Sequence, residues 1–330
     1  MAKLKIAVYW AASCGGCEIA VLEIHHHIAQ LADAADLVFC PCLVDTKYAD
    51  VEAMEDDSID LCLFNGAIRT EENVHLATLL RRKSKTLVAF GACASAGGIP
   101  GLANATTLEA IFDRVYRTTP STDNEAGVQP QTRTVIGEGM ELTLPALLPM
   151  VKALHHVVTV DYTIPGCPPE GKQVWGVIEA VLSGNLPPAG AILGAGDRTV
   201  CDECRLEKRD TKISGFKRPH ELIPDDTTCL LEQGVLCMGP ATRSGCEARC
   251  PDVNMPCRGC YGSAGEDSYA DAGLQMIGVL GAILQPSNEA ALRGIMDEVS
   301  DPVGTLYRFA LPGSLLGRAA VGQGNRGDAE

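Results

Sequence analysis

The sequence is poor in positive charge, in histidine and in long apolar runs. Its 330 residues include 27 lysines and arginines against 42 aspartates and glutamates, a formal net charge of −15. That charge opposes nonspecific attraction to nucleic acid and anionic membranes. The N-terminal residues lack the apolar segment and cleavage site of a secretory signal, and no apolar run reaches bilayer length. We therefore expect a cytoplasmic protein with no nucleic-acid partner and no membrane insertion.

Cysteine, by contrast, is abundant. The chain has 15 cysteines and only 7 histidines. In the reducing cytoplasm, and at an odd count, disulfides explain these thiols poorly. Thiolates with almost no accompanying histidine suit zinc or iron–sulfur clusters. The spacing of the cysteines must distinguish a zinc site from an iron–sulfur cluster.

Strand-like and helix-like segments alternate in the first half of the chain, and 46% hydrophobic residues supply an ample core. Apolar runs predict strands at residues 3–9, 37–44, 61–65, 86–90 and 157–162, extending toward residue 164. Helical spacing predicts helices at residues 17–31, 73–83 and 173–182. This order predicts an α/β fold whose parallel sheet binds ligands beyond the carboxyl ends of its strands.

The pattern changes after the two prolines at 187–188. Residues 201–260 hold eight cysteines and few strand signals, and helices are predicted at 274–284 and 290–299. We predict an α/β domain at 1–188, a smaller loop- and helix-rich domain at 189–312 whose core is inorganic, and a flexible tail at 313–330.

Four cysteines fall on strand-to-helix loops at one sheet edge. This first group is Cys14, Cys17, Cys93 and Cys167. Glycines and prolines flank them; glycine lets the backbone approach a bulky cluster, and proline stiffens a loop without adding a donor. The second group is Cys201, Cys204, Cys229 and Cys237, and the third is Cys246, Cys250, Cys257 and Cys260.

Zinc remains an alternative for the later groups, since each contains a Cys-x-x-Cys pair that could be half of a ribbon-type site. The first group favours iron–sulfur chemistry because its ligands are spread over three loops, whereas zinc ribbons use two short knuckles. Three cysteines are left over: Cys40, Cys42 and Cys62. They lie on strand-like apolar segments, so we expect them to pack as small hydrophobic residues.

Together these motifs resemble the small subunit of nickel–iron hydrogenases. The resemblance covers nearly the whole chain and rests on Cys14-Gly-Gly-Cys17-Glu18, Gly91-x-Cys93 with Gly97-Gly98, Pro165-Gly-Cys167-Pro-Pro and Cys257-Arg-Gly-Cys260. It implies a flavodoxin-like first domain. It also implies three 4Fe–4S clusters: a proximal one on the first group, a distal one on the second and a medial one on the third.

Two departures refine the resemblance. Many exported members have a histidine and a proline where this chain has Cys201 and Cys250. Two additional thiolates imply four-iron clusters and lower potentials. The chain thus looks most like the cytoplasmic methyl-viologen-reducing type, which serves a heterodisulfide reductase through a small iron–sulfur partner. In this family nickel lies in a large subunit, so the resemblance implies electron conduction and no catalytic residue here.

Two other functions stay open. A hydrogenase subunit could serve a deazaflavin or nicotinamide module, although no G-x-G-x-x-G fingerprint follows a strand here. A zinc-stabilised scaffold or interaction protein is the candidate from a different class.

Three weaker features have simpler explanations. His25, His26 and His27 point about 100° apart on a helix, so they are expected on a polar face or an interface. Glu18 fits the first turn of a helix better than a proton-transfer role. Basic residues after Cys204 could dock an acidic electron acceptor or merely be solvated: Arg205, Lys208, Arg209, Lys212, Lys217 and Arg218.

Overall fold

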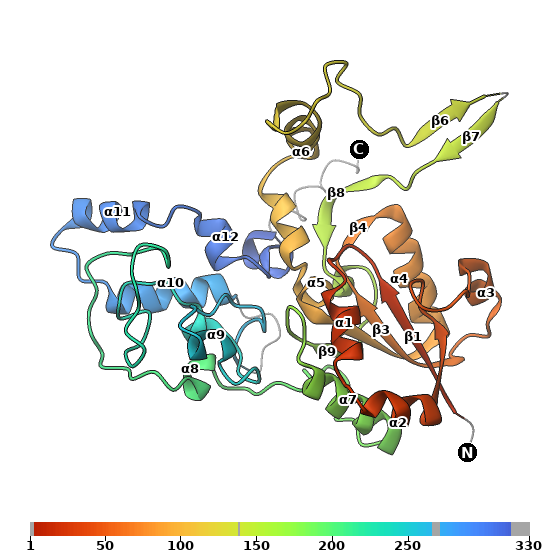
Figure 1. Ribbon diagram of the computed structural model, residues 1–330, viewed down its shortest axis with the longest axis horizontal. Coiled ribbons are helices and arrows are strands. Elements are labelled where there is room, and N and C mark those ends of the chain that lie inside the picture. Colours follow the sequence, from red (N-terminus) through yellow and green to blue (C-terminus); the bar gives the residue numbers. More distant parts are fainter. Residues whose placement is uncertain (1–2, 138, 266–270, 318–330) are drawn as a thin grey trace, which may run out of the picture.

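The computed structural model describes residues 3–137, 139–265 and 271–317, and a five-stranded parallel sheet forms its centre (Figure 1). The strands are β1 (Leu4–Trp10), β2 (Ala35–Phe39), β3 (Ile59–Asn65), β5 (Ser84–Phe90) and β9 (Tyr162–Ile164). They lie in the order β2-β1-β3-β5-β9. Counted along the chain, this is the 2-1-3-4-5 order of flavodoxin-like sheets. The predicted flavodoxin-like fold is confirmed.

Alternating side chains of the strands fill two cores, one on each face of the sheet. From β1, Ile6 and Val8 enter one core, while Ala7 and Tyr9 enter the other. The first core is covered by α1 (Gly16–Leu22), α2 (His27–Ala34) and α7 (Gly171–Ser183). The second is covered by α3 (Tyr48–Ala53), α4 (Glu71–Lys83) and α5 (Gly91–Ala96). Burial on both faces explains why the strands are almost continuously apolar.

Three predicted elements are wrong in their bounds. The helix predicted at 17–31 is interrupted between α1 and α2, where His25 adopts a left-handed φ of 55°. The strand predicted at 37–44 ends at Phe39, because the N–H groups of Leu43 and Val44 turn back to the carbonyl of Cys40. The strand predicted at 157–162 begins only at Tyr162, since Val157 and Val158 donate to Leu154 instead of to the sheet.

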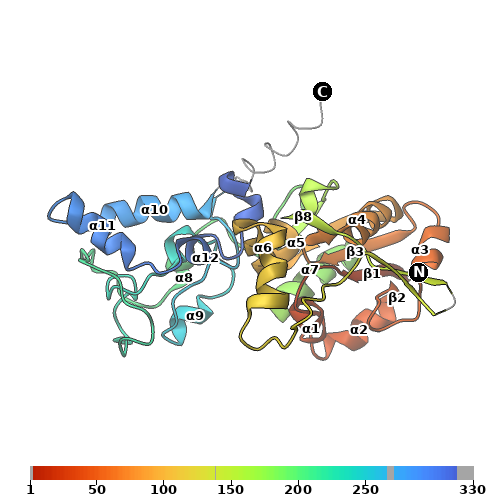
Figure 2. The same cartoon turned by 90° about the horizontal axis from the view of Figure 1, so that it is seen from above.

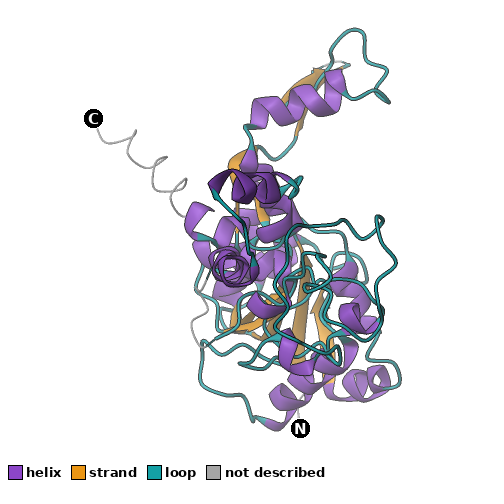
Figure 3. Ribbon diagram, turned by 90° about the vertical axis from the view of Figure 1, so that its left-hand side faces the viewer, coloured by secondary structure: helices purple, strands orange, loops and turns teal. Residues whose placement is uncertain are grey.

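The structure also contains elements that the sequence pattern did not indicate. Strand β4 (Ile68–Thr70) pairs antiparallel with β8 (Leu147–Lys152), and β6 (Arg133–Ile136) forms a hairpin with β7 (Met140–Thr143). This hairpin projects away from the rest of the molecule (Figures 1 and 3). Between β5 and β6 lie a 3-10 segment (Ile99–Ala105), α6 (Leu108–Asp113) and a π-helical turn (Arg114–Thr118).

The cysteine-rich part of the chain lies beside the sheet as short helices and long loops (Figure 2). It contains α8 (Val200–Glu203), α9 (Arg249–Asp252), α10 (Ala272–Ile283), α11 (Glu289–Asp297) and α12 (Pro302–Leu306), with 3-10 turns at Gly239–Ala241 and Leu311–Gly313. Helices α10 and α11 confirm the two predicted helices. Among the described helices, none combines the length and apolar character needed to cross a bilayer.

The predicted domain bounds, 1–188, 189–312 and 313–330, stay predictions. Of the predicted tail, residues 318–330 lie outside the described part. The side chain of Ser314 is buried and donates to the carbonyl of Leu311, and the ring of Pro312 lies where a side chain at Gly97 or Gly101 would be. The last described residues therefore pack against the loop that follows α5.

Candidate iron–sulfur site

The first cysteine group gathers at the carboxyl edge of the sheet. Cys14 and Cys17 follow β1, Cys93 lies in α5 directly after β5, and Cys167 follows β9. The N–H of Ala92 donates to the carbonyl of Gly166 at 2.7 Å, which joins two of the three loops. Since β1 lies at the point where the strand order reverses, this edge is where a flavodoxin-like fold presents a ligand crevice.

Glycines give the sulfurs of this group their space. Gly91 and Gly98 have positive φ values of 83° and 56°. A Cβ atom on Gly91 would overlap the Sγ of Cys17, and one on Gly98 would lie 2.5 Å from the Sγ of Cys93. Both positions thus require glycine for conformation and for room.

Burial makes negative charge on these thiols unfavourable. It raises the pKa of Cys93 to about 12, and the neighbouring thiols of Cys167 and Cys14 add to the effect. Burial also raises the pKa of Cys17 far above its usual range, followed by the charges of Glu18 and of the three other thiols of the group. Bound metal cations would offset the repulsion between the negative charges of these thiolates and of Glu18. The four sulfurs therefore fit a metal cluster.

Asn65, at the end of β3, is a residue of this site that the sequence reasoning missed. Its fully buried amide nitrogen donates to both carboxylate oxygens of Glu18, at 2.7 and 2.8 Å, and to the Oγ of Ser13 at 2.9 Å. Glu18 lies in the first turn of α1, as the simpler interpretation predicted. The signal was an asparagine directly after the apolar run of residues 61–64.

The second group surrounds one small cavity. Its four cysteines line this cavity together with Lys208 and Gly239. The ammonium of Lys208 donates to the carbonyls of Cys201 and Cys204, at 2.7 and 3.0 Å. Burial raises the pKa of Cys201 to about 12, the thiol of Cys229 adds to this, and the charge of Lys208 opposes it.

The third group lies between the other two. Burial raises the pKa of Cys257 to about 11, and its neighbours Cys246 and Cys250 contribute. The N–H of Cys257 donates to the Sγ of Cys237 at 3.2 Å, which joins the third group to the second. On the other side, burial and nearby thiols raise the pKa of Cys260, and Cys167 of the first group is among those thiols.

A buried hydrogen bond also joins the loops of the first and third groups. Tyr261, which follows Cys260, donates to Oε1 of Gln173 at 2.8 Å. The amide nitrogen of Gln173 in turn donates to the carbonyls of Pro165 and Leu193, at 3.3 and 3.2 Å. A glutamine inside a helix gave no sequence signal for this role.

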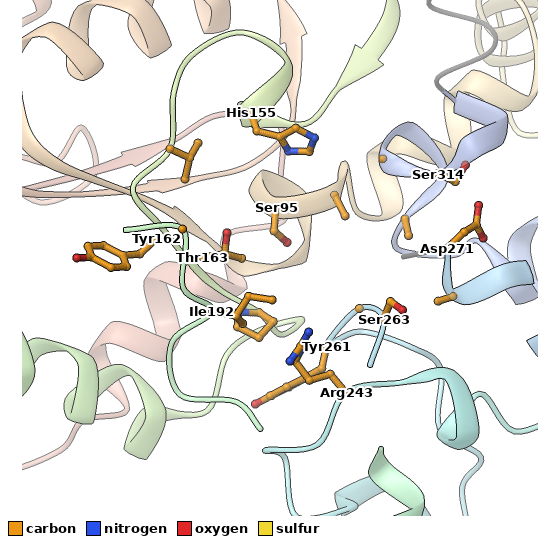
Figure 4. Close-up of a pocket in the computed structure, with 18 of the residues that line it drawn as sticks. Ser95, His155, Tyr162, Thr163, Ile192, Arg243, Tyr261, Ser263, Asp271 and Ser314 are labelled. Atoms are coloured by element: carbon orange, nitrogen blue, oxygen red, sulfur yellow. The ribbon is translucent and has the colours of Figure 1, made fainter. Parts of the chain in front are cut away.

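A second cavity lies between the two parts of the chain. It has a volume of ≈ 190 Å³, and its lining includes Ser95 and Thr163 from the sheet side with Arg243 and Tyr261 from the other (Figure 4). Arg243 is buried and donates to the carbonyl oxygens of Gly196 and Gly265. The described lining of this cavity contains no cysteine, so the cavity is separate from the three cysteine groups.

The remaining predicted features have structural roles. The ring of His27 stacks on Trp175 of α7 with centroids 4.2 Å apart. Several basic residues bond within the chain: Arg205 to the carbonyls of Asp226 and Asp252, and Lys212 to that of Ala282. Docking of an acceptor by these residues stays a prediction.

Within the described ranges, no three Cys, His, Asp or Glu side chains are placed to hold a single metal ion.

The three leftover cysteines differ from the prediction at one position. Cys40 and Cys62 are buried, as expected. Cys42 is exposed, because it lies in the turn after β2 and not in a strand.

Comparison with known proteins places this geometry in a family. The family model described as "NADH ubiquinone oxidoreductase, 20 Kd subunit" matches residues 14–181, the span that holds the first group. An iron–sulfur subunit of the F420-non-reducing hydrogenase of Archaeoglobus profundus is 43% identical over 325 residues, 96% of this chain and 98% of that protein. The chain belongs to the nickel–iron hydrogenase small-subunit family. The name of the Archaeoglobus profundus relative describes that protein as an iron–sulfur subunit of a hydrogenase.

Further relatives of this small subunit include a vhu-type F420-non-reducing hydrogenase subunit of Methanocaldococcus jannaschii, 37% identical over 96% of this chain and 98% of that protein. Among solved structures, one chain of an NAD+-reducing [NiFe]-hydrogenase is 30% identical. It aligns with a TM-score of 0.47 over 56% of this chain and 94% of that chain.

Proposed function

We propose that this small subunit conducts electrons between a hydrogen-activating large subunit and an acceptor through three 4Fe–4S clusters. The proximal cluster would be held by the first group, the medial by the third and the distal by the second. The observation that carries the proposal is the linear order of the groups, with Cys167 near Cys260 and Cys237 bonded to the N–H of Cys257. Electrons from hydrogen oxidation would enter at the first group and leave at the second.

The residues of the chain suit this task. When bound, the clusters supply one-electron carriers. The cysteines anchor them, and Gly91 and Gly98 leave room at the first group. At the second group, Cys237 accepts a hydrogen bond from the N–H of Cys257, and the ammonium of Lys208 lies close by. Both favour the additional negative charge of a reduced cluster, which supports electron acceptance there.

We infer that the acceptor is a small iron–sulfur protein leading to a heterodisulfide reductase, in the cytoplasm. The relatives named "F420-non-reducing" favour this over a deazaflavin acceptor. The match to the delta subunit of an "NAD-reducing hydrogenase" is weaker, 25% identity over 55% of this chain. A nicotinamide module is therefore the second choice.

The test is anaerobic purification of the native assembly with the full chain. We expect about twelve iron atoms and as many acid-labile sulfides per chain, paramagnetic signals on reduction, and nickel in a co-purifying large subunit. Colourless protein with bound zinc would replace the proposal by the scaffold alternative.

A matched pair of variants assigns the ligands. Cys246→Ser should lower the iron content by about four atoms or convert one cluster to a three-iron form. Cys62→Ser, at a buried cysteine outside the three groups, should leave it unchanged. Equal iron content in both variants would contradict the assignment of Cys246.

A further inference from the structure

The turn after β2 brings together two thiols that the electron-transfer proposal does not use. The Sγ atoms of Cys40 and Cys42 lie 3.4 Å apart. Cys40 is buried, with 2% of its surface exposed, whereas Cys42 is exposed. The carbonyl of Cys40 accepts bonds from the N–H groups of Leu43 and Val44, both at 2.9 Å, so the turn holds this pair in place.

We propose that Cys40 and Cys42 form a reversible dithiol–disulfide site, at which Cys42 reacts first with a low-molecular-weight disulfide and Cys40 completes the exchange. The inference does not depend on the ligand assignment of the three groups.

The distance suits this chemistry. A disulfide requires sulfurs about 2.05 Å apart and Cα atoms within roughly 7 Å. Residues separated by one position in a turn meet the second condition, and the sulfurs need to approach by only about 1.4 Å. Cys40 also lines an apolar cavity of ≈ 310 Å³ between β2, α1 and α2, which leaves its side chain room to turn.

Exposure assigns the two roles. Burial, and then the hydrogen bond with Cys42, raise the pKa of Cys40 to about 11, so Cys40 is protonated at neutral pH. The thiolate is the attacking form, and it also needs access to the reagent. Cys42 has that access, and Cys40 lies within reach of the mixed disulfide once it forms.

The exchange balances without another reagent. The Cys42 thiolate attacks the small disulfide RSSR, forms a mixed disulfide and releases one thiolate, which takes up the proton that Cys42 gave to water. Cys40 then loses its proton to water, and its thiolate attacks the Cys42 sulfur. The second RS− leaves and takes up a proton as RSH. The protein dithiol is oxidised by two electrons and RSSR is reduced to two RSH. A disulfide across a single residue is strained, which makes it easy to reduce.

The experiment treats the anaerobic holoprotein with oxidised glutathione, blocks the remaining thiols, and measures the mass of the peptide that contains both cysteines. We expect this peptide to lose two hydrogen atoms, and dithiothreitol to restore it. Iron content and visible absorption, measured in parallel, should stay constant, which shows that the reaction spares the three groups.

Two variants fix the roles. Cys40→Ser should accumulate glutathione on Cys42, and Cys42→Ser should not react. An unmodified wild-type peptide, a mixed disulfide that never resolves, or a Cys42→Ser variant that reacts as fast as wild type would each overturn the proposal.

Discussion

The chemistry of each cysteine depends on its immediate surroundings. Burial raises the pKa of Cys62 and of Cys93 to about 12 in both cases. Cys62 lies inside β3 and packs with the core of one sheet face. Cys93 is also raised by the thiols of Cys167 and Cys14. Burial is therefore the main cause of the raised pKa at both cysteines, and only at Cys93 do neighbouring thiols add to it.

The glycines around Cys93 provide a prediction at this scale. Gly98→Ala would place a methyl group against the Cys93 side chain in a backbone conformation that alanine rarely adopts. Strain of this kind costs about 1–3 kcal/mol, and the displaced sulfur should lower the iron content by about four atoms. Iron analysis and thermal unfolding of the holoprotein measure both effects.

Gly176→Ala is the matched control. A Cβ at this position in α7 meets no atom within 4 Å. Alanine in a helix is favoured over glycine by roughly 0.5–1 kcal/mol, so iron content should be unchanged and stability slightly higher. If Gly98→Ala behaves in the same way, the sulfur at Cys93 has more freedom than the structure indicates.

At the scale of elements, hydrogen bonds between loops set the positions of the cysteine groups. The bond from Tyr261 to Gln173 connects the third group to α7, and Gln173 holds the loop before Cys167. Because both side chains are buried, neither bond can be replaced by water without rearrangement.

Tyr261→Phe tests this connection. The variant keeps the ring and leaves Oε1 of Gln173 with only the longer bond from the N–H of Glu170, at 3.3 Å. The loss of one buried hydrogen bond should lower the free energy of unfolding by about 0.5–1.5 kcal/mol. Amide hydrogen exchange should become faster near residues 165–169 and 257–262. Tyr162→Phe is the control, since its hydroxyl donates to Pro187 at an exposed position. Equal losses in both variants would show that the buried bond has no special role.

Some helices and strands were predictable from the sequence and others were not. Central strands and long helices were predicted because continuous apolar runs and helical spacing are local signals, as in β3 and α4. The break at His25 was not predictable, since a left-handed histidine follows from how α1 and α2 both pack on the sheet. For the same reason the exposed hairpin of β6 and β7 was missed: its strands bury no face, so they lack the usual alternation.

At the scale of the whole molecule, the two parts of the chain depend on different sources of stability. The sheet has a full apolar core on each face. The core of the cysteine-rich part includes Cys237 and Cys257 among its buried residues, with Cys204, Cys229 and Cys246 packed against them. If these thiols hold the proposed clusters, metal–thiolate bonds contribute much of the folding free energy of this part.

Anaerobic removal of iron with a chelator should therefore unfold the parts unequally. We expect residues 200–265 and 271–313 to lose most of their protection from hydrogen exchange, while the strands of the sheet keep theirs. Exchange measured by mass spectrometry follows both regions in one sample, so the sheet is the internal control. Cooperative unfolding of the whole chain would contradict this division.

The sequence alone determined that this is an α/β protein with three groups of four cysteines, because apolar periodicity and cysteine spacing are properties of the chain itself. The tertiary structure decided the rest. It set the linear order of the groups, the bonds through Asn65, Lys208 and Tyr261, and the meeting of Cys40 with Cys42. These depend on side chains from separate elements or on the geometry of a turn, and distances of that kind follow only from how the elements pack.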